Sequence, residues 1–378
     1  MPDARFLQIH TLHGYAAVLL NRDDSGLAKR IPYGDAMRTR VSSQCLKRHW
    51  RVAESPHALQ KIDGAAASVR SRETVSRRVI QPLTKAGYDQ GVTDAISTAF
   101  QTAVYGDKGA DRGSRQPLLL GEREIEYLAA EAQRIAEEHP GDAKAAKDAA
   151  TSWAKNSKAN MKALRDECAL PGGIAAALFG RMVTSDVEAN IDAAVHVAHA
   201  FTVHSEESES DYFTVVDDLH RTEDDAGADH IGETELTSGL FYGYVVLDRQ
   251  ALVANLGHDV EMAGEVAQKL VHLIATVTPG AKLGPTAPYG YASWIVVEAG
   301  DRQPRSLAEA YRKPCKPDRL VAAQTAGQFL KKVDAVYETG EARRFISLEE
   351  TEVPGAERSE SLRELATWAG AAMKTGSA

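Results

Sequence analysis

Eight basic side chains lie between residues 22 and 51, and their types and spacing suit the binding of phosphate groups. They are Arg22, Lys29, Arg30, Arg38, Arg40, Lys47, Arg48 and Arg51. A guanidinium group forms paired hydrogen bonds with phosphate oxygens. Ser42 and Ser43 stand where a helix is expected to begin, and the free amides at such an end also bind phosphate. A second interpretation stays open, in which these cations form a solvated surface that pairs with Asp23, Asp24 and Asp35.

A second set of basic residues recurs at the spacing of one helix face. Its members are Lys155, Lys158, Lys162 and Arg165. Because residues three, four and seven apart lie on the same side of a helix, these side chains form one basic stripe. Such a stripe either contacts nucleic acid or keeps an exposed helix soluble, and composition does not separate the two uses.

Histidines and paired aspartates raise the questions of metal binding and catalysis. His196, His199 and His204 have spacings that could bring imidazoles together, but their Ala and Val neighbours favour a packed helix. Asp23 and Asp24 could assist phosphodiester cleavage, although loop aspartates more often close turns or pair with arginine. We therefore predict no metal ligand, no cofactor and no catalytic residue.

Two aromatic residues, Tyr212 and Phe213, interrupt a strongly acidic stretch. Residues 204–235 contain 12 Asp and Glu and one Arg. An exposed ring can stack on a nucleic-acid base, which contributes about 1–3 kcal/mol. The acidic surroundings oppose continuous contact with a phosphate backbone, so a single wedge is the only nucleic-acid role that fits. A hydrophobic contact that holds a hairpin together, or docks it on a protein, fits equally well.

Charge is segregated along the chain. The 378 residues carry 44 Lys and Arg against 53 Asp and Glu, a net charge of −9, whereas residues 1–80 carry 14 against 7. A polyanion is therefore attracted to the first region and repelled by the acidic stretch. Three cysteines are too few for a disulfide framework, and the longest apolar runs are too short to span a membrane. We expect a cytoplasmic protein with no membrane partner.

Hydrophobic periodicity predicts the elements that position these residues. Strands are expected over 5–12, 177–184, 240–248 and 291–299, and helices over 42–54, 122–139, 185–204 and 257–277, with further helices through most of 57–170 and in the tail. Residues 20–35 are expected to form a loop, and residues 204–235 a hairpin-like arm. The chain lacks the glycine-rich phosphate loops of nucleotide-binding α/β enzymes, so an α+β fold is predicted.

Several separated blocks resemble one protein family. They are LNRDDSG…RVSSQCLKRHWR, GRMVTS, IDAAVHVAHAFTVH, DYFTVVDDL, HIGETELTSGLFYGY and LVHLIATVTPGAKLGPTAPY. In this order they resemble the backbone subunit (CasC family) of the type I-E CRISPR surveillance complex Cascade. The resemblance implies an RRM-like (ferredoxin-like) palm with a helical insertion and a β-hairpin thumb. The palm would comprise 1–56 and 171–300 with a thumb at about 203–237, the inserted lobe 57–170, and a helical part packed on the palm 301–378.

The resemblance implies a protein of antiviral defence that is not an enzyme. Several copies would stack along the guide RNA (crRNA), alongside other Cascade subunits, and present its bases for pairing with target double-stranded DNA. The positions matching the family's guide-binding residues are Arg22, Ser42, Ser43, Gln44, Lys47, Arg48, Arg51, Arg70, Met182, Phe213, Thr214 and Lys282. The stripe from Lys155 to Arg165 would face the DNA. Cys45 replaces an expected serine, which should not affect RNA binding.

Two hypotheses extend this interpretation. Unlike charges could set the stacking direction if the acidic arm reaches the next copy's basic surface. Glu206, Glu207, Asp217 and Asp218 would then contribute to assembly. The alternative function is that of an RNA-cleaving backbone subunit from an RNA-targeting CRISPR complex, with Asp23 or Asp24 as the catalytic carboxylate.

Overall fold

The structure, a computed structural model, describes residues 4–167, 170, 172–183, 186–215 and 230–375. The chain divides into two compact units. The first unit comprises residues 1–58, 196–247 and 264–378, and the second comprises residues 59–195 and 248–263. The chain therefore leaves the first unit twice and returns to it twice. This arrangement makes the second unit an insertion in the first.

In the described residues, a ten-stranded sheet lies in the first unit, and two of its strands extend one residue beyond the boundaries of that unit. Its principal order is β12 (Ala356–Arg358), β11 (Ala342–Ser347), β10 (Ala292–Gly300), β1 (Phe6–Val18), β9 (His230–Asp248), β7 (Ala200–Thr202), β3 (Ala36–Val41) and β2 (Arg30–Tyr33). Strands β6 (Val195–Val197) and β8 (Glu207–Val215) also pair with β9. Strand β12 runs parallel to β11, while β1 and β10 pair antiparallel from Phe6 opposite Gly300. The sheet is therefore mixed, and the fold class is α+β as predicted.

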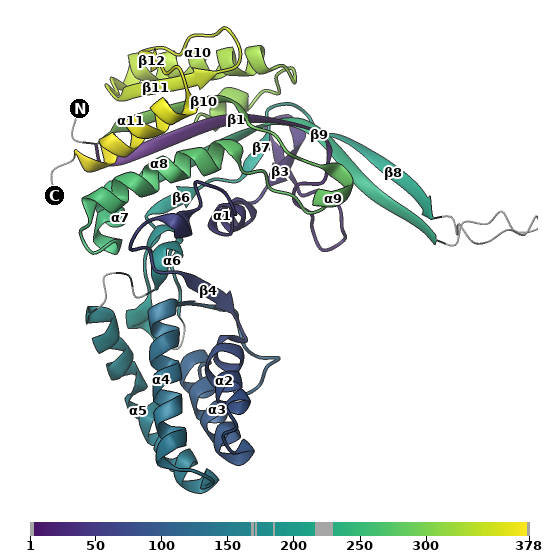
Figure 1. Ribbon diagram of the computed structural model, residues 1–378. Helices are drawn as coiled ribbons and strands as arrows, with labels where there is room; N and C mark the ends of the chain where they lie inside the picture. Colours follow the sequence, from purple (N-terminus) through teal and green to yellow (C-terminus); the bar gives the residue numbers. More distant parts are fainter. Residues whose placement is uncertain (1–3, 168–169, 171, 184–185, 216–229, 376–378) are drawn as a thin grey trace, which may run out of the picture. The chain divides into compact units, whose positions relative to one another are not determined.

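Helices cover both faces of this sheet (Figure 1). On one face α10 (Arg319–Tyr337) packs over alternate residues of the central strands, including Leu12, Tyr242 and Trp294. Helices α8 (Val260–Thr276) and α11 (Leu362–Lys374) run beside β1 on the opposite face. Because successive strand side chains point to opposite faces, a strand buried on both sides must be apolar almost throughout. The nine residues of β10 are all buried, as this predicts.

A buried charged cluster ties the central strands together. Glu298 on β10 accepts from His10 on β1 at 3.1 Å and from Arg305 at 2.9 Å, and it also pairs with Arg343 on β11. Burial favours the neutral carboxyl and would raise the pKa of Glu298. The bond to His10 and the positive charges of Arg343 and Arg305 outweigh burial and lower the pKa to about 2. Glu298 is thus held as a buried anion.

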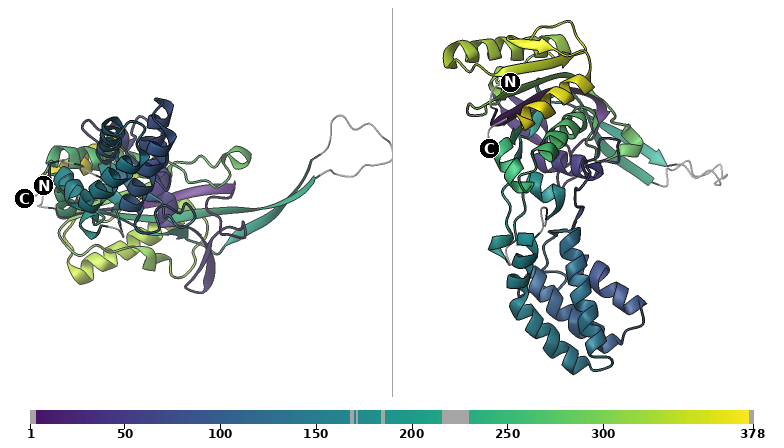
Figure 2. Two further views of the ribbon diagram at one scale, coloured as in Figure 1. Left: turned by 90° about the horizontal axis from the view of Figure 1, so that it is seen from below. Right: turned by 60° about the vertical axis from the view of Figure 1, so that its left-hand side comes forward.

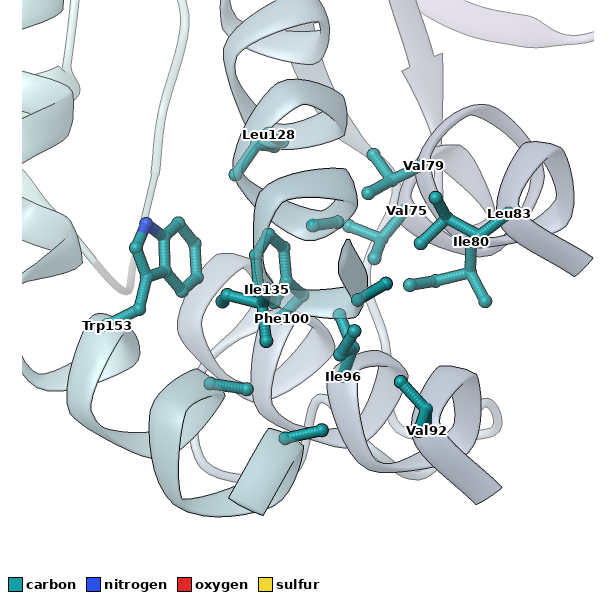
Figure 3. Close-up of a cluster of buried hydrophobic side chains, with 14 of the residues drawn as sticks. Val75, Val79, Ile80, Leu83, Val92, Ile96, Phe100, Leu128, Ile135 and Trp153 are labelled. Atoms are coloured by element: carbon teal, nitrogen blue, oxygen red, sulfur yellow. The ribbon is translucent and has the colours of Figure 1, made fainter. Parts of the chain in front are cut away.

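The second unit is mostly helical, as predicted for 57–170. Its helices are α2 (Gln81–Lys85), α3 (Gln90–Tyr105), α4 (Glu122–Glu138), α5 (Ala143–Glu167), α6 (Gly173–Phe179) and α7 (Arg249–Asn255), beside a π-helix over Val75–Ile80 and the paired strands β4 (Ser68–Ser71) and β5 (Leu118–Gly121). Figure 3 shows the apolar core between these helices, where the rings of Phe100 and Trp153 stack with centroids 3.8 Å apart. Residues at helical spacing, such as Leu128 and Ile135, supply the rest of this core.

Four sequence predictions need correction. The helix predicted over 185–204 is wrong, because within it the described residues 195–197 and 200–202 form β6 and β7, where pairing with the large sheet overrides helical spacing. The strand predicted over 177–184 is wrong, since α6 ends at Phe179. The loop predicted over 20–35 contains β2, which pairs with β3. The tail contains strands β11 and β12 as well as helices.

The other strands and helices named above agree with the periodicity. Strands form over the described parts of 5–12, 240–248 and 291–299, and α8 forms within 257–277. No helix in the described ranges is both long and apolar enough to span a bilayer. Ser185, the first residue of the helix predicted over 185–204, lies outside the described residues.

Candidate nucleic-acid interface

Helix α1 (Ser43–Arg51) begins where the sequence predicted. Ser42 is its N-cap, because its Oγ accepts from the amide of Cys45 at 3.4 Å. The amide of Ser42 itself donates to Asn21 Oδ1 at 2.9 Å, which ties the preceding loop to the helix. Ser42 is buried, whereas Ser43 is half-buried and Gln44 is exposed. Ser42 therefore shapes this end of the helix, while Ser43 and Gln44 are accessible to solvent there.

The cations of α1 lie opposite its buried face. Trp50 is buried, and Leu46 packs against the apolar cluster that contains Val41. Arg48 is exposed, while Lys47 and Arg51 are half-buried and make contacts within the chain. The short helix is thus held by its apolar side, and its cationic side is left toward solvent.

The surroundings of α1 carry a positive potential. Burial raises the pKa of the Cys45 thiol, and the charges of Lys29 and Arg48 oppose this rise. Burial lowers the pKa of His199, and the charges of Arg40 and Lys29 lower it further. Arg40 Nη1 lies 2.9 Å from His199 Nδ1, which holds that ring neutral. Lys29 and Arg48 thus lie near Cys45, and Arg40 and Lys29 lie near His199, so several cations gather at this edge of the sheet.

The loop before β2 is closed by its own aspartate. Asp23 Oδ1 accepts from the amide of Leu27 at 2.9 Å, and the amide of Asp23 donates to the Leu27 carbonyl at 2.8 Å. Arg22 forms a bridge with Ala28 at the neck of the loop, and its side chain is exposed. The structure therefore gives Asp23 a turn-forming role and presents Arg22 at the surface beside it.

The segment that carries Lys282 joins α1 to the thumb. The amide of Gly280 donates to His49 Nε2 at 3.4 Å, and the amide of Ala281 donates to the carbonyl of Leu19 at 2.9 Å. The ammonium of Lys282, just before α9 (Leu283–Thr286), donates to Thr234 Oγ1 on β9. Contacts inside the first unit thus bring Lys282, α1 and strand β9 together.

The thumb hairpin comprises β8 and the part of β9 paired with it, residues 230–238. The left view of Figure 2 shows these two strands as a ribbon that extends from the sheet. Phe213 lies opposite Gly232, and a Cβ added at Gly232 would come within 2.2 Å of the Phe213 ring. The ring therefore packs flat on the glycine backbone. Phe213 remains 42% exposed and Tyr212 61% exposed. Phe213 is therefore a surface ring that also packs against Gly232.

An internal ion cluster anchors the base of the thumb. Arg30 on β2 pairs with Glu206 and with Glu235, and Glu235 Oε2 also accepts from the amide of Ala28 at 2.6 Å. The chain thus already pairs Glu206 internally, and its contact with a neighbouring copy stays a prediction. Asp217 and Asp218 lie outside the described residues. Sequence reasoning missed Glu235, whose partners are more than 200 residues away in the chain.

The remaining predicted residues are Thr214 of the thumb and several residues of the second unit. Thr214 is exposed. In the second unit, Arg70 on β4 is also exposed. Met182 is 79% exposed. On α5, Lys155 is exposed and Lys162 Nζ lies 3.1 Å from Glu188 Oε2. The side chains of Lys158 and Arg165 lie outside the described residues.

The three histidines considered as metal ligands do not form a cluster. His204 is buried, its Nε2 accepts from the amide of Leu240 at 3.0 Å, and its Nδ1 then donates to the carbonyl of Ser205 at 2.7 Å. Both of its ring nitrogens are therefore occupied. Across the described ranges, no three His, Cys, Asp or Glu side chains gather as metal ligands.

Comparisons with known proteins agree with this arrangement. A family model described as CT1975-like protein matches residues 7–369. A chain from a solved "CRISPR RNA-guided surveillance complex, pre-nicking" is 28% identical, with a TM-score of 0.79, over 97% of this chain and 100% of that chain. A chain from another "CRISPR RNA-guided surveillance complex" shares the fold at 24% identity and a TM-score of 0.69, over 97% of this chain and 99% of that chain. No curated protein matches. The family match confirms the resemblance seen in the sequence, and the chain belongs to the CT1975-like family of CasC-type CRISPR backbone subunits.

Proposed function

We propose that this chain is the guide-RNA-binding backbone subunit of a type I-E Cascade complex. One observation carries the proposal: Gly280 contacts α1 while Lys282, two residues later, contacts thumb strand β9. Three separate sequence blocks with expected RNA contacts are thereby held in one unit. Arg48 on α1 and Arg22 in the adjacent loop are exposed cations that suit a phosphate backbone. Phe213 supplies a ring on which a displaced base can stack.

The finer architecture follows from the same proposal. The sheet with α1 and α8 forms an RRM-like palm, β8 and β9 form the thumb, and the second unit is the helical lobe. Copies stack head to tail along crRNA in the cytoplasm, together with other Cascade subunits, and the α5 stripe faces target double-stranded DNA. Since Glu206 is used internally, the exposed acids Glu207, Glu209 and Asp211 remain as contacts for the basic surface of the next copy.

The proposal includes no catalysis by this chain. The alternative assigns RNA cleavage to Asp23 or Asp24. The bond from the Leu27 amide to Asp23 Oδ1 supports a structural role for Asp23 instead. A complementary RNA held on guide filaments should stay intact with Mg²⁺ present. Cuts that recur at the period of the subunits, and disappear in an Asp24→Asn chain, would favour the ribonuclease.

The test of the proposal is what copurifies with the chain. Expressed with the other complex subunits and a CRISPR transcript, the chain should appear in a multi-copy particle that contains one discrete protected RNA. A triple variant of α1, Lys47→Ala, Arg48→Ala and Arg51→Ala, should lose that RNA. The control removes the same charge from three exposed lysines of the first unit, Lys316, Lys331 and Lys332.

The two triple variants separate specific binding from net charge. Thermal unfolding first establishes that both chains are folded. RNA retained by the α1 triple at the level of the parent chain would place the guide elsewhere on the molecule. Equal loss of RNA in both triples would reduce the proposed interface to a general effect of charge.

A further inference from the structure

The exposed side chain of Met182 stands between two residues that are fixed to the body of the second unit. The amide and carbonyl of Arg181 exchange hydrogen bonds with those of Ile191, both at 2.9 Å. The amide of Val183 donates to Asn190 Oδ1 at 2.6 Å. Methionine has three rotatable side-chain bonds, so the exposed side chain of Met182 stays flexible, and these contacts fix the point from which it extends. Here the backbone is held on both sides of Met182.

The side chain of Arg181 makes the deepest of these attachments. It is 1% exposed, as is the side chain of Glu124 on α4, and Arg181 Nη1 lies 2.6 Å from Glu124 Oε2. Arg181 Nε donates to the carbonyl of Ala189 at 3.0 Å. Glu124 Oε2 also accepts from the amide of Gly121, which closes the first turn of α4. One buried ion pair therefore joins this helix end to the residue before Met182.

Gly180 completes the turn that delivers Arg181 to this position. Its φ is +77°, and a Cβ here would lie 3.0 Å from the carbonyl oxygen of Ile191 and 3.1 Å from the amide of Ala193. Only glycine adopts this conformation in so close a space without strain. The sequence Gly180-Arg181-Met182 thus combines a turn, an anchor and an exposed side chain.

A buried ion pair is a poor device for stability, because two charges must leave water and an apolar pair of similar volume often stabilises a fold equally well. It is a good device for fixing one arrangement among several, since a buried charge that loses its partner is costly. The Arg181–Glu124 pair is therefore better explained by the arrangement that it fixes. That arrangement is the position of the backbone at Met182.

We propose that Arg181 and Glu124 are positioning residues that hold the backbone of Met182 where its side chain can wedge against the guide RNA. The inference rests on the proposed function for the guide contact of Met182, while the anchoring itself concerns the chain alone. Glu124 precedes Met182 by 58 residues and lies on α4, whereas Met182 lies in the segment after α6, so the position of the wedge is set by the fold of the helical unit.

The anchoring is tested on the full chain without RNA, by NMR of the backbone amides of isotope-labelled methionines. The sequence contains six methionines, so the Met182 signal is identified by loss in Met182→Ala. In Glu124→Gln the Met182 amide should become mobile and shift toward its random-coil position. The control Glu122→Gln removes the ion pair with Arg78 from the same helix turn and should leave the signal unchanged. An unchanged Met182 signal in folded Glu124→Gln would overturn the anchoring.

A second variant keeps the test decisive if Glu124→Gln does not fold. The double replacement Glu124→Leu with Arg181→Met removes both charges at similar volume and is expected to fold. Its Met182 amide should also be mobile. A Met182 signal as rigid as that of the parent chain would mean that neither charge positions the wedge.

The contribution to guide binding is tested by a double-mutant cycle on the assembled complex. Glu124→Gln should weaken guide binding about tenfold in the parent chain and leave it unchanged in a Met182→Ala background, because the two changes remove the same contact. Independent, multiplicative losses would overturn the positioning role. If Met182→Ala alone binds guide like the parent while the α1 triple does not, the guide contact of Met182 is wrong, whatever the amide signals show.

Discussion

The dependence of RNA affinity on salt offers the sharpest measure of what α1 does. A cation that neutralises one phosphate of a single strand contributes about 0.7 to the slope of log affinity against log salt. If Lys47, Arg48 and Arg51 each contact one phosphate, their joint removal should flatten that slope by about 2. Between about 50 mM and about 200 mM salt, the affinity advantage of the parent chain over the triple variant should then fall about 20-fold.

The assay is fluorescence anisotropy of a labelled CRISPR transcript with the full chain, at four or more salt concentrations. The single variant Arg48→Gln removes the exposed cation and should change the slope by about 0.7. Lys47 and Arg51 make other contacts within the chain, so their variants require a matched unfolding curve. The triple at Lys316, Lys331 and Lys332 is the control for net charge.

The slope of log affinity against log salt tests the phosphate contacts of α1 more directly than the affinity does. A destabilised α1 could weaken RNA binding at every salt concentration and leave the slope as it was. An α1 triple that weakens binding at constant slope would therefore show that the helix supports the fold without contacting phosphate. A control triple that flattens the slope as much as the α1 triple would show that the RNA does not distinguish these surfaces.

Three further outcomes follow from the buried contacts. Gly232→Ala should displace the Phe213 ring and reduce the fluorescence change of a 2-aminopurine base placed at the thumb, with unchanged particle size as the folding control. Glu298→Gln should cost about 3–5 kcal/mol and lower the Tm by roughly 6–20 °C at pH 7, and in the parent chain this stabilisation should fade as pH drops from about 4.3 toward 2. Burial and then the neighbouring His57 lower the pKa of His272 to about 4, so its neutral form stabilises the fold above about pH 6.5. His272→Phe should therefore lose less stability than the parent between pH 7 and pH 5 in urea unfolding, and equal losses would contradict this assignment.

Sequence signals were sufficient where an element carries its own cap and apolar stripe. Helix α1 could be located from Ser42 and the positions of Leu46 and Trp50, because a cap and an apolar stripe are local signals. Strand β2 could not, since it has only four residues and contains a proline at the edge of the sheet. Its pairing with β3 becomes visible only once the chain has turned at Gly34.

Residues that organise the interface were hidden for a related reason. Asn21 looks like any loop asparagine until Ser42 donates to it, and Glu235 looks like one acid among many until Arg30 lies beside it. A sequence displays residue type and spacing, whereas these roles depend on partners brought close by the sheet. Family resemblance located the positively charged residues, but it did not show which neighbours hold them.

The pairing of β1 with β10 determines when the sheet can be completed during synthesis of the chain. Phe6 of β1 pairs with Gly300, and the intervening strand partner β9 begins only at residue 230. At about 5–20 residues per second, β1 waits roughly 15–60 s after leaving the ribosome for its last neighbour. The helical core of the second unit is drawn from residues 75–153 and is complete within the first half of the chain. The helical core of the inserted unit is therefore complete before the sheet of the first unit, and the nascent chain folds from its middle outward while strand β1 remains uncovered.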